Sequence, residues 1–307
     1  MSPEQQPERT AGLGDGDLSG TTVLVTGSTH GIGRVAALSF GRLGATVLVH
    51  GRDAEAGETV VTEIKSEGGE GQFFRADLLS PDAVSELAAE VADSVAELDV
   101  LCNNAGGFFT EREPTVLGVD RAFHINHLSH FHLTAELLEV LAPDARVVTT
   151  ASLAHRGAML GFDTLLDLTG LSPVGAYCRS KLANVQFALE LARRLDADGR
   201  QITSNAFHPG IIPGSEFGRA LPTPLVDSFE LVATPVTETP ADGAATLVYL
   251  GASPAVSAVS GGYFARCRQI QPSKTARNQA TARTLWRRSS ELLGIAEPLA
   301  TATDYMG

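Results

Sequence analysis

Short apolar runs alternate with amphipathic helical segments along most of this chain, and that alternation limits the fold more than any other feature. The first two runs, residues 22–26 and 46–50, are β-branched and apolar on both faces, as is typical of strands buried in a parallel sheet. Helical spacing follows each run, at residues 32–43 and 54–66. The pattern predicts an α/β protein whose doubly wound sheet has helices on both faces.

The alternation continues to about residue 265 without a linker, which predicts one domain. Residues 1–18 are polar, and we expect them to be a disordered extension before a domain at 19–296 and a C-terminal tail at 297–307. Further strands, for a total of about seven, are expected at 72–75, 98–102, 146–150, 202–207 and 262–265. Further helices are expected at 82–96, 116–141, 175–197, 241–250 and 276–294. The last helix should pack Trp286 on the domain, with a dimer contact as the alternative.

The charge balance narrows the classes of partner. The net charge is −13 and the pI is about 5.0, so nucleic acid and anionic membranes are poor partners. The N-terminal segment does not resemble a signal peptide, and no apolar run approaches the roughly 20 residues of a membrane helix. We therefore expect a cytoplasmic protein without a membrane anchor, and a homo-oligomer stays open.

A glycine-rich turn, T-G-S-T-H-G-I-G, joins the first strand to the first helix. Glycines at such a turn let the backbone approach a pyrophosphate at the N-terminus of the helix. The strand–turn–helix setting therefore predicts a dinucleotide site. The residues assigned to it are Gly27, Ser28, Thr29, His30, Gly31, Ile32 and Gly33.

The end of the second strand indicates which dinucleotide binds. Folds that select NAD place an acidic residue there for the ribose 2′-hydroxyl, whereas this chain has His50-Gly51-Arg52. Arg52 can pair with a 2′-phosphate, so NADP(H) is favoured over NAD(H), and a plain surface cation is the alternative. Asp53 is expected to cap the next helix.

The third strand ends at Asp77-Leu78, which we assign to the adenine contact. The carboxylate of Asp77 can accept a hydrogen bond from the adenine amino group or can cap the helix that follows Ser80 and Pro81.

Tyr177 and Lys181 stand four residues apart in a predicted helix, so both side chains share one face. A phenol has an ordinary pKa of about 10. A fixed ammonium beside it favours the phenolate and is expected to lower that pKa. The pair is suited to donating and accepting a proton in alcohol–carbonyl chemistry.

Three polar features precede this pair, each near the carboxyl end of a strand or facing it. Asn104, Ala105 and Gly106 end the fourth strand, Asn126 stands within a helix, and Ser152 follows the fifth strand. Ligands bind at that edge of a doubly wound sheet, so we expect these residues beside Tyr177 and Lys181.

The motifs T-G-S-T-H-G-I-G, N-N-A-G, Y-C-R-S-K and H-P-G occur in the order seen in one family. The sequence resembles a short-chain dehydrogenase/reductase, a family with a Rossmann fold, over about residues 20–294. H-I-N-H-L-S-H-F-H-L-T, A-S-L-A-H-R-G and L-W-R-R-S-S-E-L-L-G resemble the retinol dehydrogenase-like branch, which includes the catalytic domain of the WW-domain oxidoreductases.

The resemblance implies a catalytic set of Asn126, Ser152, Tyr177 and Lys181. Tyr177 would be the general acid or base, and Ser152 would bind the substrate oxygen. Lys181 would lower the pKa of Tyr177 and hold the nicotinamide ribose, while Asn126 would hold a water that links Lys181 to solvent. Cofactor contacts are also implied for Asn104, Ala105, Gly106, Tyr177, Lys181, Pro209 and Gly210. The family often has a threonine a few residues after the Pro-Gly pair, where this chain has Ser215.

Residues 153–176 and 211–240 are rich in large apolar side chains and are expected to wall a hydrophobic substrate pocket. The predicted function is an NADP(H)-dependent oxidoreductase that interconverts a hydrophobic alcohol and a ketone or aldehyde. A non-catalytic dinucleotide sensor or scaffold is the main alternative, and an epimerase or dehydratase is another. Four histidines between residues 124 and 132 do not have the spacing or the companion ligands of a metal site, so we expect no metal.

Overall fold

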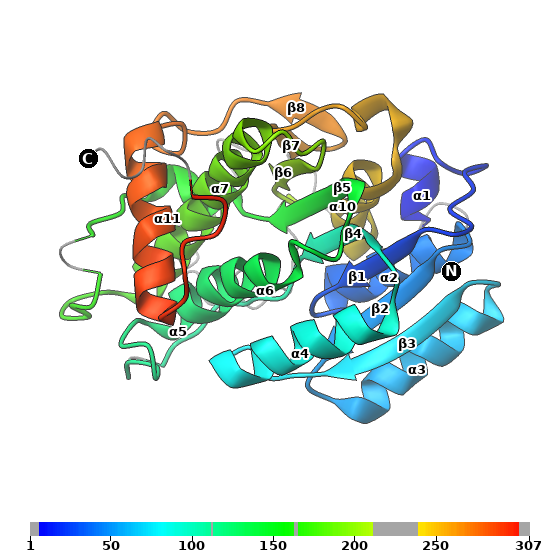
Figure 1. Ribbon diagram of the computed structural model, residues 1–307, viewed down its shortest axis with the longest axis horizontal. Coiled ribbons are helices and arrows are strands. Elements are labelled where there is room, and N and C mark those ends of the chain that lie inside the picture. Colours follow the sequence, from blue (N-terminus) through cyan, green and yellow to red (C-terminus); the bar gives the residue numbers. More distant parts are fainter. Residues whose placement is uncertain (1–5, 112, 163–164, 211–238, 301–307) are drawn as a thin grey trace.

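One sheet of eight strands organises the molecule (Figure 1). The computed structural model describes residues 6–111, 113–162, 165–210 and 239–300. The strand order is β3-β2-β1-β4-β5-β6-β7-β8; β1 to β7 are parallel, and β8 runs antiparallel to β7. This confirms the doubly wound α/β fold and adds one strand to the expected sheet. The strands are β1 Thr22–Val25, β2 Thr46–Gly51, β3 Glu70–Arg75, β4 Leu98–Asn103, β5 Leu141–Thr150, β6 Thr203–Phe207, β7 Tyr263–Ala265 and β8 Arg268–Ile270.

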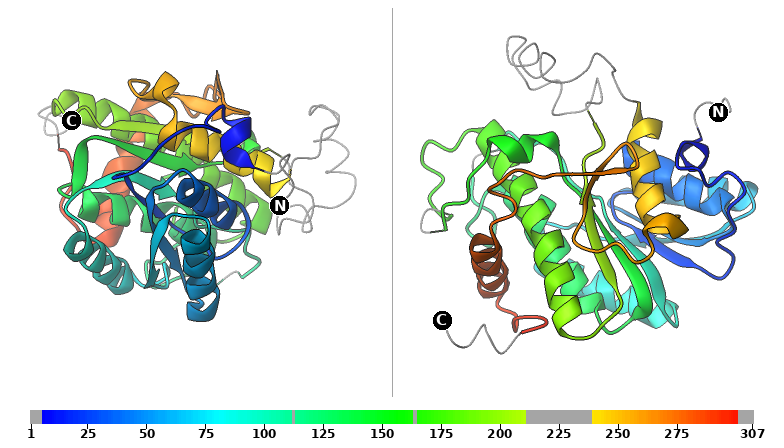
Figure 2. Two further views of the ribbon diagram at one scale, coloured as in Figure 1. Left: turned by 90° about the vertical axis from the view of Figure 1, so that its right-hand side faces the viewer. Right: turned by 90° about the horizontal axis from the view of Figure 1, so that it is seen from above.

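Helices cover both faces of the sheet, as Figure 2 shows from above. On one face lie α1 Pro7–Thr10, α2 Gly31–Arg42, α3 Ala54–Ser66 and α10 Pro240–Ala252. On the other lie α4 Pro81–Ser94, α5 Arg121–Phe123, α6 Ser129–Leu137, α7 Pro173–Ala197 and α11 Gln279–Leu293, together with the π-helical turn η2 His124–Leu128. Short 3₁₀ turns occur at η3 Leu153–Gly157 and η4 Pro254–Val256. Within the described ranges, no helix combines the length and apolar character needed to cross a bilayer.

The alternation of side chains along β1 divides the core into two layers. Val23 and Val25 pack with the layer beneath α2, α3 and α10, whereas Leu24 packs with the layer beneath α4, α6 and α7. All three side chains are fully buried. A strand with apolar residues on both faces is stable only between two helical layers, which is the arrangement that the sequence pattern predicts.

The described part of the N-terminal segment, residues 6–18, is ordered on the domain, so the expected disorder is wrong for it. α1 contacts α2 and α10. The Glu8 carboxylate accepts hydrogen bonds from Arg42 at 2.7 and 2.9 Å, and Glu8 is buried. The Arg42 guanidinium helps to hold the pKa of Glu8 below its ordinary value. The ion pair compensates for the few apolar residues of this segment.

The eighth strand depends on a two-residue turn that the sequence did not indicate. Arg266 and Cys267 join β7 to β8 with φ of 49° and 56°, a left-handed conformation that short hairpin turns require. Such positions usually carry Asn or Gly, so the hairpin has no ordinary sequence signal. The Cys267 amide donates to Thr246 Oγ1 at 3.1 Å, which ties the turn to α10.

Helix α11 packs on the domain through Trp286, as expected, and lies along α7 (Figure 1). The indole stacks on Phe187 with centroids 5.8 Å apart, and its Nε1 donates to the carbonyl of Pro298 at 3.0 Å. The Arg194 guanidinium lies 4.8 Å from the indole centroid. Gly294, at φ 68°, ends the helix as predicted.

Replacing Trp286 tests this packing. Trp286→Ala should lower the free energy of unfolding by about 3–5 kcal/mol, because it leaves a cavity among aromatic rings. Chemical denaturation would measure the loss. The control Arg287→Ala removes a side chain that is 57% exposed on the same helix, and its effect should stay within about 0.5 kcal/mol. Equal effects of the two substitutions would contradict the packing role.

Candidate active site

The glycine-rich turn lies at the carboxyl end of β1 and leads into α2. Gly33 has no room for a side chain, since a Cβ there would lie 2.4 Å from the Gly27 carbonyl oxygen and 2.5 Å from Asn104 Nδ2. Asn104 Nδ2 donates to the carbonyl of Thr26 at 2.9 Å. The turn is thus packed directly against the segment that follows β4, and the two predicted motifs form one surface.

The start of α2 is suited to an anion. The helix begins at Gly31, and no side chain caps it, because His30 makes no capping hydrogen bond. Its first turn has no acidic residue. The first amides of a helix lack partners within it and carry a partial positive charge, so they favour a phosphate group. The residues present therefore fit the pyrophosphate of a dinucleotide.

His50 supports the turn, although the sequence reasoning did not assign it a role. It is buried at the end of β2, and its Nδ1 accepts a hydrogen bond from the Gly27 amide at 3.1 Å. Burial lowers its pKa to about 4, so the ring is neutral and Nδ1 keeps its lone pair. The sequence signal for this role was a polar residue at the end of a buried strand.

Arg52 and Asp77 lie at neighbouring strand ends and are both exposed. The Arg52 carbonyl accepts a hydrogen bond from Arg75 Nε at 3.0 Å, which brings a second guanidinium group to the same strand end. Asp53 caps α3 through the Ala56 amide at 3.1 Å, as predicted.

The cap of α4 is Ser80 and not Asp77. Ser80 Oγ accepts from the Ala83 amide at 3.2 Å, whereas Asp77 accepts from the Leu79 amide at 3.1 Å. The capping alternative for Asp77 is therefore wrong. Leu78, the other residue assigned here, is buried.

Asn126 lies in the π-helical turn η2 and is fully buried. Its Oδ1 accepts from the Gly107 amide at 3.0 Å. Its Nδ2 lies 3.0 Å from the Gly107 carbonyl and 2.9 Å from Ser180 Oγ. A Cβ at Gly106 would lie 2.5 Å from Asn126 Oδ1 and 3.7 Å from Lys181 Nζ. The glycine that follows Asn104 and Ala105 is therefore needed for the close approach of Asn126.

Ser152, Tyr177 and Lys181 meet where β5 ends against α7. The Ser152 side chain lies close enough to the Tyr177 hydroxyl to affect its pKa. Lys181 Nζ lies 5.8 Å from the centroid of the Tyr177 ring and donates to the Thr150 carbonyl at 3.1 Å. The structure thus brings together the hydroxyl, phenol and ammonium groups that the sequence analysis selected.

The pKa of Tyr177 shifts in the direction opposite to the expected one. Burial raises it to about 12, and the hydrogen bond from Ser152 only partly offsets that rise. Lys181 lies over the ring and donates to the Thr150 carbonyl, and it does not bring the pKa of this phenol below the ordinary value. Burial lowers the pKa of Lys181 itself to about 8.

His208, Pro209 and Gly210 follow β6 at the same edge of the sheet, and the Gly210 amide donates to His208 Nδ1 at 3.2 Å. Ser215 lies outside the described residues, as do residues 211–238 of the wall expected at 211–240. In the other expected wall, Leu165 is buried, whereas Met159 is 81% and Leu166 58% exposed.

The four clustered histidines are buried, and burial lowers the pKa of three of them, His124, His127 and His130. His130 joins two parts of the site, since Nδ1 bonds to the Asn126 carbonyl at 3.0 Å and Nε2 to Thr26 Oγ1 at 3.1 Å. Among the described residues, no group of three or more His, Cys, Asp or Glu side chains is placed to hold a metal ion.

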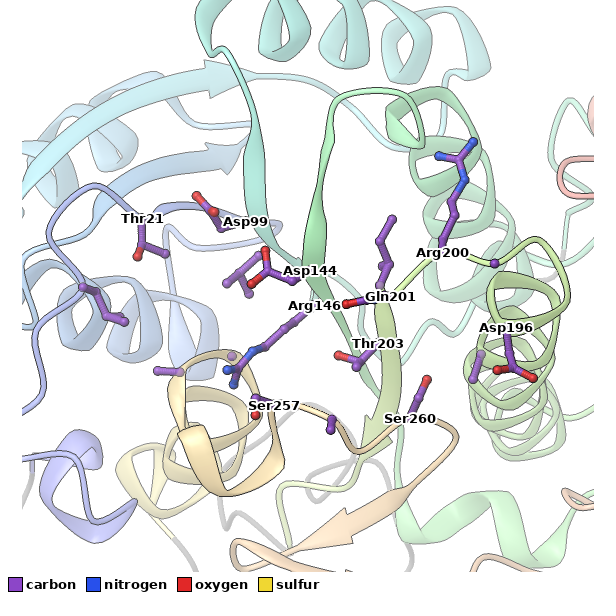
Figure 3. A pocket seen from close by; sticks show the side chains of 18 residues that line it. Thr21, Asp99, Asp144, Arg146, Asp196, Arg200, Gln201, Thr203, Ser257 and Ser260 are labelled. Carbon is purple, nitrogen blue, oxygen red and sulfur yellow. The ribbon is translucent and has the colours of Figure 1, made fainter.

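A depression of about 680 Å³ lies at the opposite edge of the sheet, at the amino ends of β4, β5 and β6 (Figure 3). Arg146 extends into it and donates to the carbonyls of Leu250 and Ser253, at 3.3 and 2.8 Å, at the end of α10. Asp99 accepts from the Thr22 amide at 2.7 Å. These polar groups join strands and helices, so we assign the depression no part in the candidate site.

Comparison with known proteins connects this arrangement to a family. A family model described as short chain dehydrogenase matches residues 21–223. Mouse retinol dehydrogenase 14 is 37% identical over 305 residues, which cover 94% of this chain and 90% of that protein. Mouse polyprenol dehydrogenase is 37% identical over 286 residues, 90% of this chain and 84% of that protein. The solved structure of landomycin C-6 ketoreductase LanV with bound NADP and rabelomycin is 29% identical, with a TM-score of 0.65, and the match covers 82% of this chain and 96% of that one.

The burial of Lys181 predicts a pH dependence of stability. Its folded pKa, about 8, lies below the ordinary value of 10.5, so folding is penalised while the amine is charged. That penalty is present below pH 8 and is relieved as the pH rises towards 10.5. Relative to Lys181→Met, the free energy of unfolding of the wild type should rise by up to about 1.4 kcal/mol per pH unit in this window. Urea denaturation between pH 7 and pH 10 measures it.

The matched control is Lys65→Met, because Lys65 is exposed on α3. The difference between the wild type and this variant should not change with pH. A constant difference for Lys181→Met as well would show that Lys181 keeps an ordinary pKa.

Proposed function

Because the chain belongs to the short-chain dehydrogenase/reductase family, we propose that it interconverts a hydrophobic alcohol and its ketone or aldehyde with NADP(H). The chain is retinol dehydrogenase-like and is an oxidoreductase that acts on CH–OH groups. The observation that carries the proposed mechanism is the approach of Ser152 and Lys181 to Tyr177, at the edge of the sheet where the glycine-rich turn lies.

Tyr177 donates or accepts the proton of the reaction. In reduction its hydroxyl gives a proton to the substrate oxygen, and in oxidation its phenolate takes that proton back. The Ser152 hydroxyl donates a hydrogen bond to the same oxygen and fixes its position. The phenolate left by proton donation lies near the Lys181 ammonium, which stabilises the new negative charge.

The residues around the glycine-rich turn hold the dinucleotide. The open amides at the start of α2 bind its pyrophosphate, Asp77 binds the adenine amino group, and Lys181 binds the nicotinamide ribose. When bound, the nicotinamide supplies the hydride chemistry, so the protein has only to position the substrate and move one proton.

Arg52 favours NADP(H) through its charge. Asp53 is the nearest carboxylate in the sequence, and its capping bond to Ala56 occupies it. The guanidinium of Arg52 is exposed at the end of β2, where it can pair with a 2′-phosphate. The NADP bound to the similar landomycin ketoreductase supports the same choice.

The substrate is a small hydrophobic molecule. The relatives are named for retinol and polyprenol, which are apolar alcohols. Phe108 lies beside the Tyr177 ring, with centroids 5.9 Å apart, which supports an apolar surface next to the proton donor. A cytoplasmic location and a homo-oligomer stay predictions from the sequence.

The first test removes the proton donor. Tyr177→Phe should lower turnover of an apolar carbonyl by more than about 10²-fold, because a positioned general acid contributes at least that much. NADPH oxidation followed by absorbance measures it. The control Tyr249→Phe removes a hydroxyl on α10, across the sheet, and should leave turnover unchanged. Full turnover in Tyr177→Phe would refute the mechanism, and full NADPH binding without turnover in the wild type would favour a sensor.

A second test concerns the choice of cofactor. Arg52→Gln should weaken NADPH binding roughly tenfold to a hundredfold, since a charge-assisted hydrogen bond is lost, and should leave NADH binding nearly unchanged. Fluorescence titration with both dinucleotides measures the two affinities. Arg200→Gln, which removes a cation at the opposite edge of the sheet, is the control and should change neither affinity. Equal losses for NADPH and NADH in Arg52→Gln would overturn the assignment.

A further inference from the structure

His155 lies in the 3₁₀ turn that directly follows Ser152 and is fully buried. Its Nδ1 lies 2.7 Å from the carbonyl oxygen of Ser152, and its Nε2 lies 3.1 Å from the backbone amide of Ser273. The imidazole also packs edge-on against Tyr263, with ring centroids 5.0 Å apart. One side chain thus joins the backbone of the predicted catalytic serine to the segment after β8.

These two contacts determine which nitrogen of the ring carries the proton. A backbone amide only donates, so Nε2 must present its lone pair to Ser273. In the neutral ring the proton is then on Nδ1, which donates to the carbonyl of Ser152. Burial lowers the pKa of His155, which keeps the ring in this neutral form.

We propose that His155 is a positioning residue that orients Ser152 for the reaction, an inference that rests on the proposed function. Ser152 adopts an extended backbone with φ −156° and ψ 157°, and its Oγ accepts from the Ala154 amide at 3.2 Å. A rotation of the peptide that joins Ser152 to Leu153 would displace the next peptide, which carries the Ala154 amide, and so the hydroxyl that this amide orients. The bond from His155 holds this peptide in place.

Tyr263 holds the same carbonyl from β7. Its hydroxyl lies 3.5 Å from the carbonyl oxygen of Ser152 and 3.3 Å from His155 Nδ1. Burial raises the pKa of Tyr263, so the hydroxyl stays protonated and can donate. His155 and Tyr263 therefore connect the serine turn to the sheet edge and to residue 273, while Ser152 contacts Tyr177. A small displacement of the Ser152 hydroxyl would slow the reaction, so we expect these contacts to affect kcat.

A matched pair of substitutions separates the two bonds of His155. Asparagine places an amide nitrogen near the position of Nδ1 and can keep the bond to Ser152. Glutamine places its amide oxygen near the position of Nε2 and can accept the hydrogen bond from the Ser273 amide. We expect His155→Gln to lower kcat about tenfold, the loss typical of one hydrogen bond, with the KM for NADPH unchanged. His155→Asn should recover most of kcat.

A double-mutant cycle with Ser152→Ala identifies the route of the effect. If His155 acts through Ser152, His155→Gln should reduce kcat no further once the serine hydroxyl is absent. Independent, multiplicative losses would overturn the proposal, and so would a kcat for His155→Asn as low as that for His155→Gln. Thermal unfolding of each variant separates these effects from a loss of folding.

The control is His132→Asn, which replaces another buried histidine, one that contacts Ser85 and Glu136 between α4 and α6. It should leave kcat unchanged, and an equal loss of kcat would overturn the proposal. Failure of the proposed function would give a different result from failure of the present inference. It would appear as absent turnover in the wild type, or as unchanged turnover in Ser152→Ala. Failure of the present inference would leave both of those results normal.

Discussion

The buried side chain of Asn126 is the connection on which the rest of the candidate site depends. It bonds to both backbone groups of Gly107 after β4 and to Ser180 on α7, and it does so from a π-helical turn. Ser180 stands on α7 between Tyr177 and Lys181, so its bond ties the helix that carries both of them to Asn126. An apolar side chain at this position would remove the bonds to the half-buried amide and carbonyl of Gly107, and a buried polar group without a partner costs about 1–3 kcal/mol. Asparagine is a mediocre helix former, but here its side chain bonds to two other segments of the chain.

The layers of the fold could be predicted because they follow from local pattern. Residues 22–25 alternate between two cores, and the helices between the strands have one apolar face each. The predictions that were wrong or missing concern contacts between distant residues or unusual turns. Residues 6–18 are held by the bond of Glu8 to Arg42 and by the packing of Leu13 and Leu18 on the core, which no local pattern in an acidic segment reveals. The hairpin at Arg266 and Cys267 lacks the residues that usually mark such a turn.

The residues of the candidate site could be predicted where they belong to family motifs. Their pKa values could be predicted less well, because these depend on burial and neighbours in the folded chain. Ser152, Tyr177 and Lys181 lie together as expected, yet burial and not Lys181 dominates the pKa of Tyr177. The supporting residues His50 and His155 were missed, because a buried histidine reveals its partners only in the folded chain. The catalytic and cofactor roles themselves stay predictions.

The eighth strand affects whether the sheets of two copies of this protein can pair edge to edge. Among the strands that the structure describes, β8 and β3 are the two edges of the sheet. β8 is only three residues long and exposes Arg268 and Gln269, while β3 exposes Glu70 and Arg75. Short, charged edges oppose the addition of a further strand. The charged side chains on both described edges therefore disfavour pairing of the sheet of one molecule with that of the next.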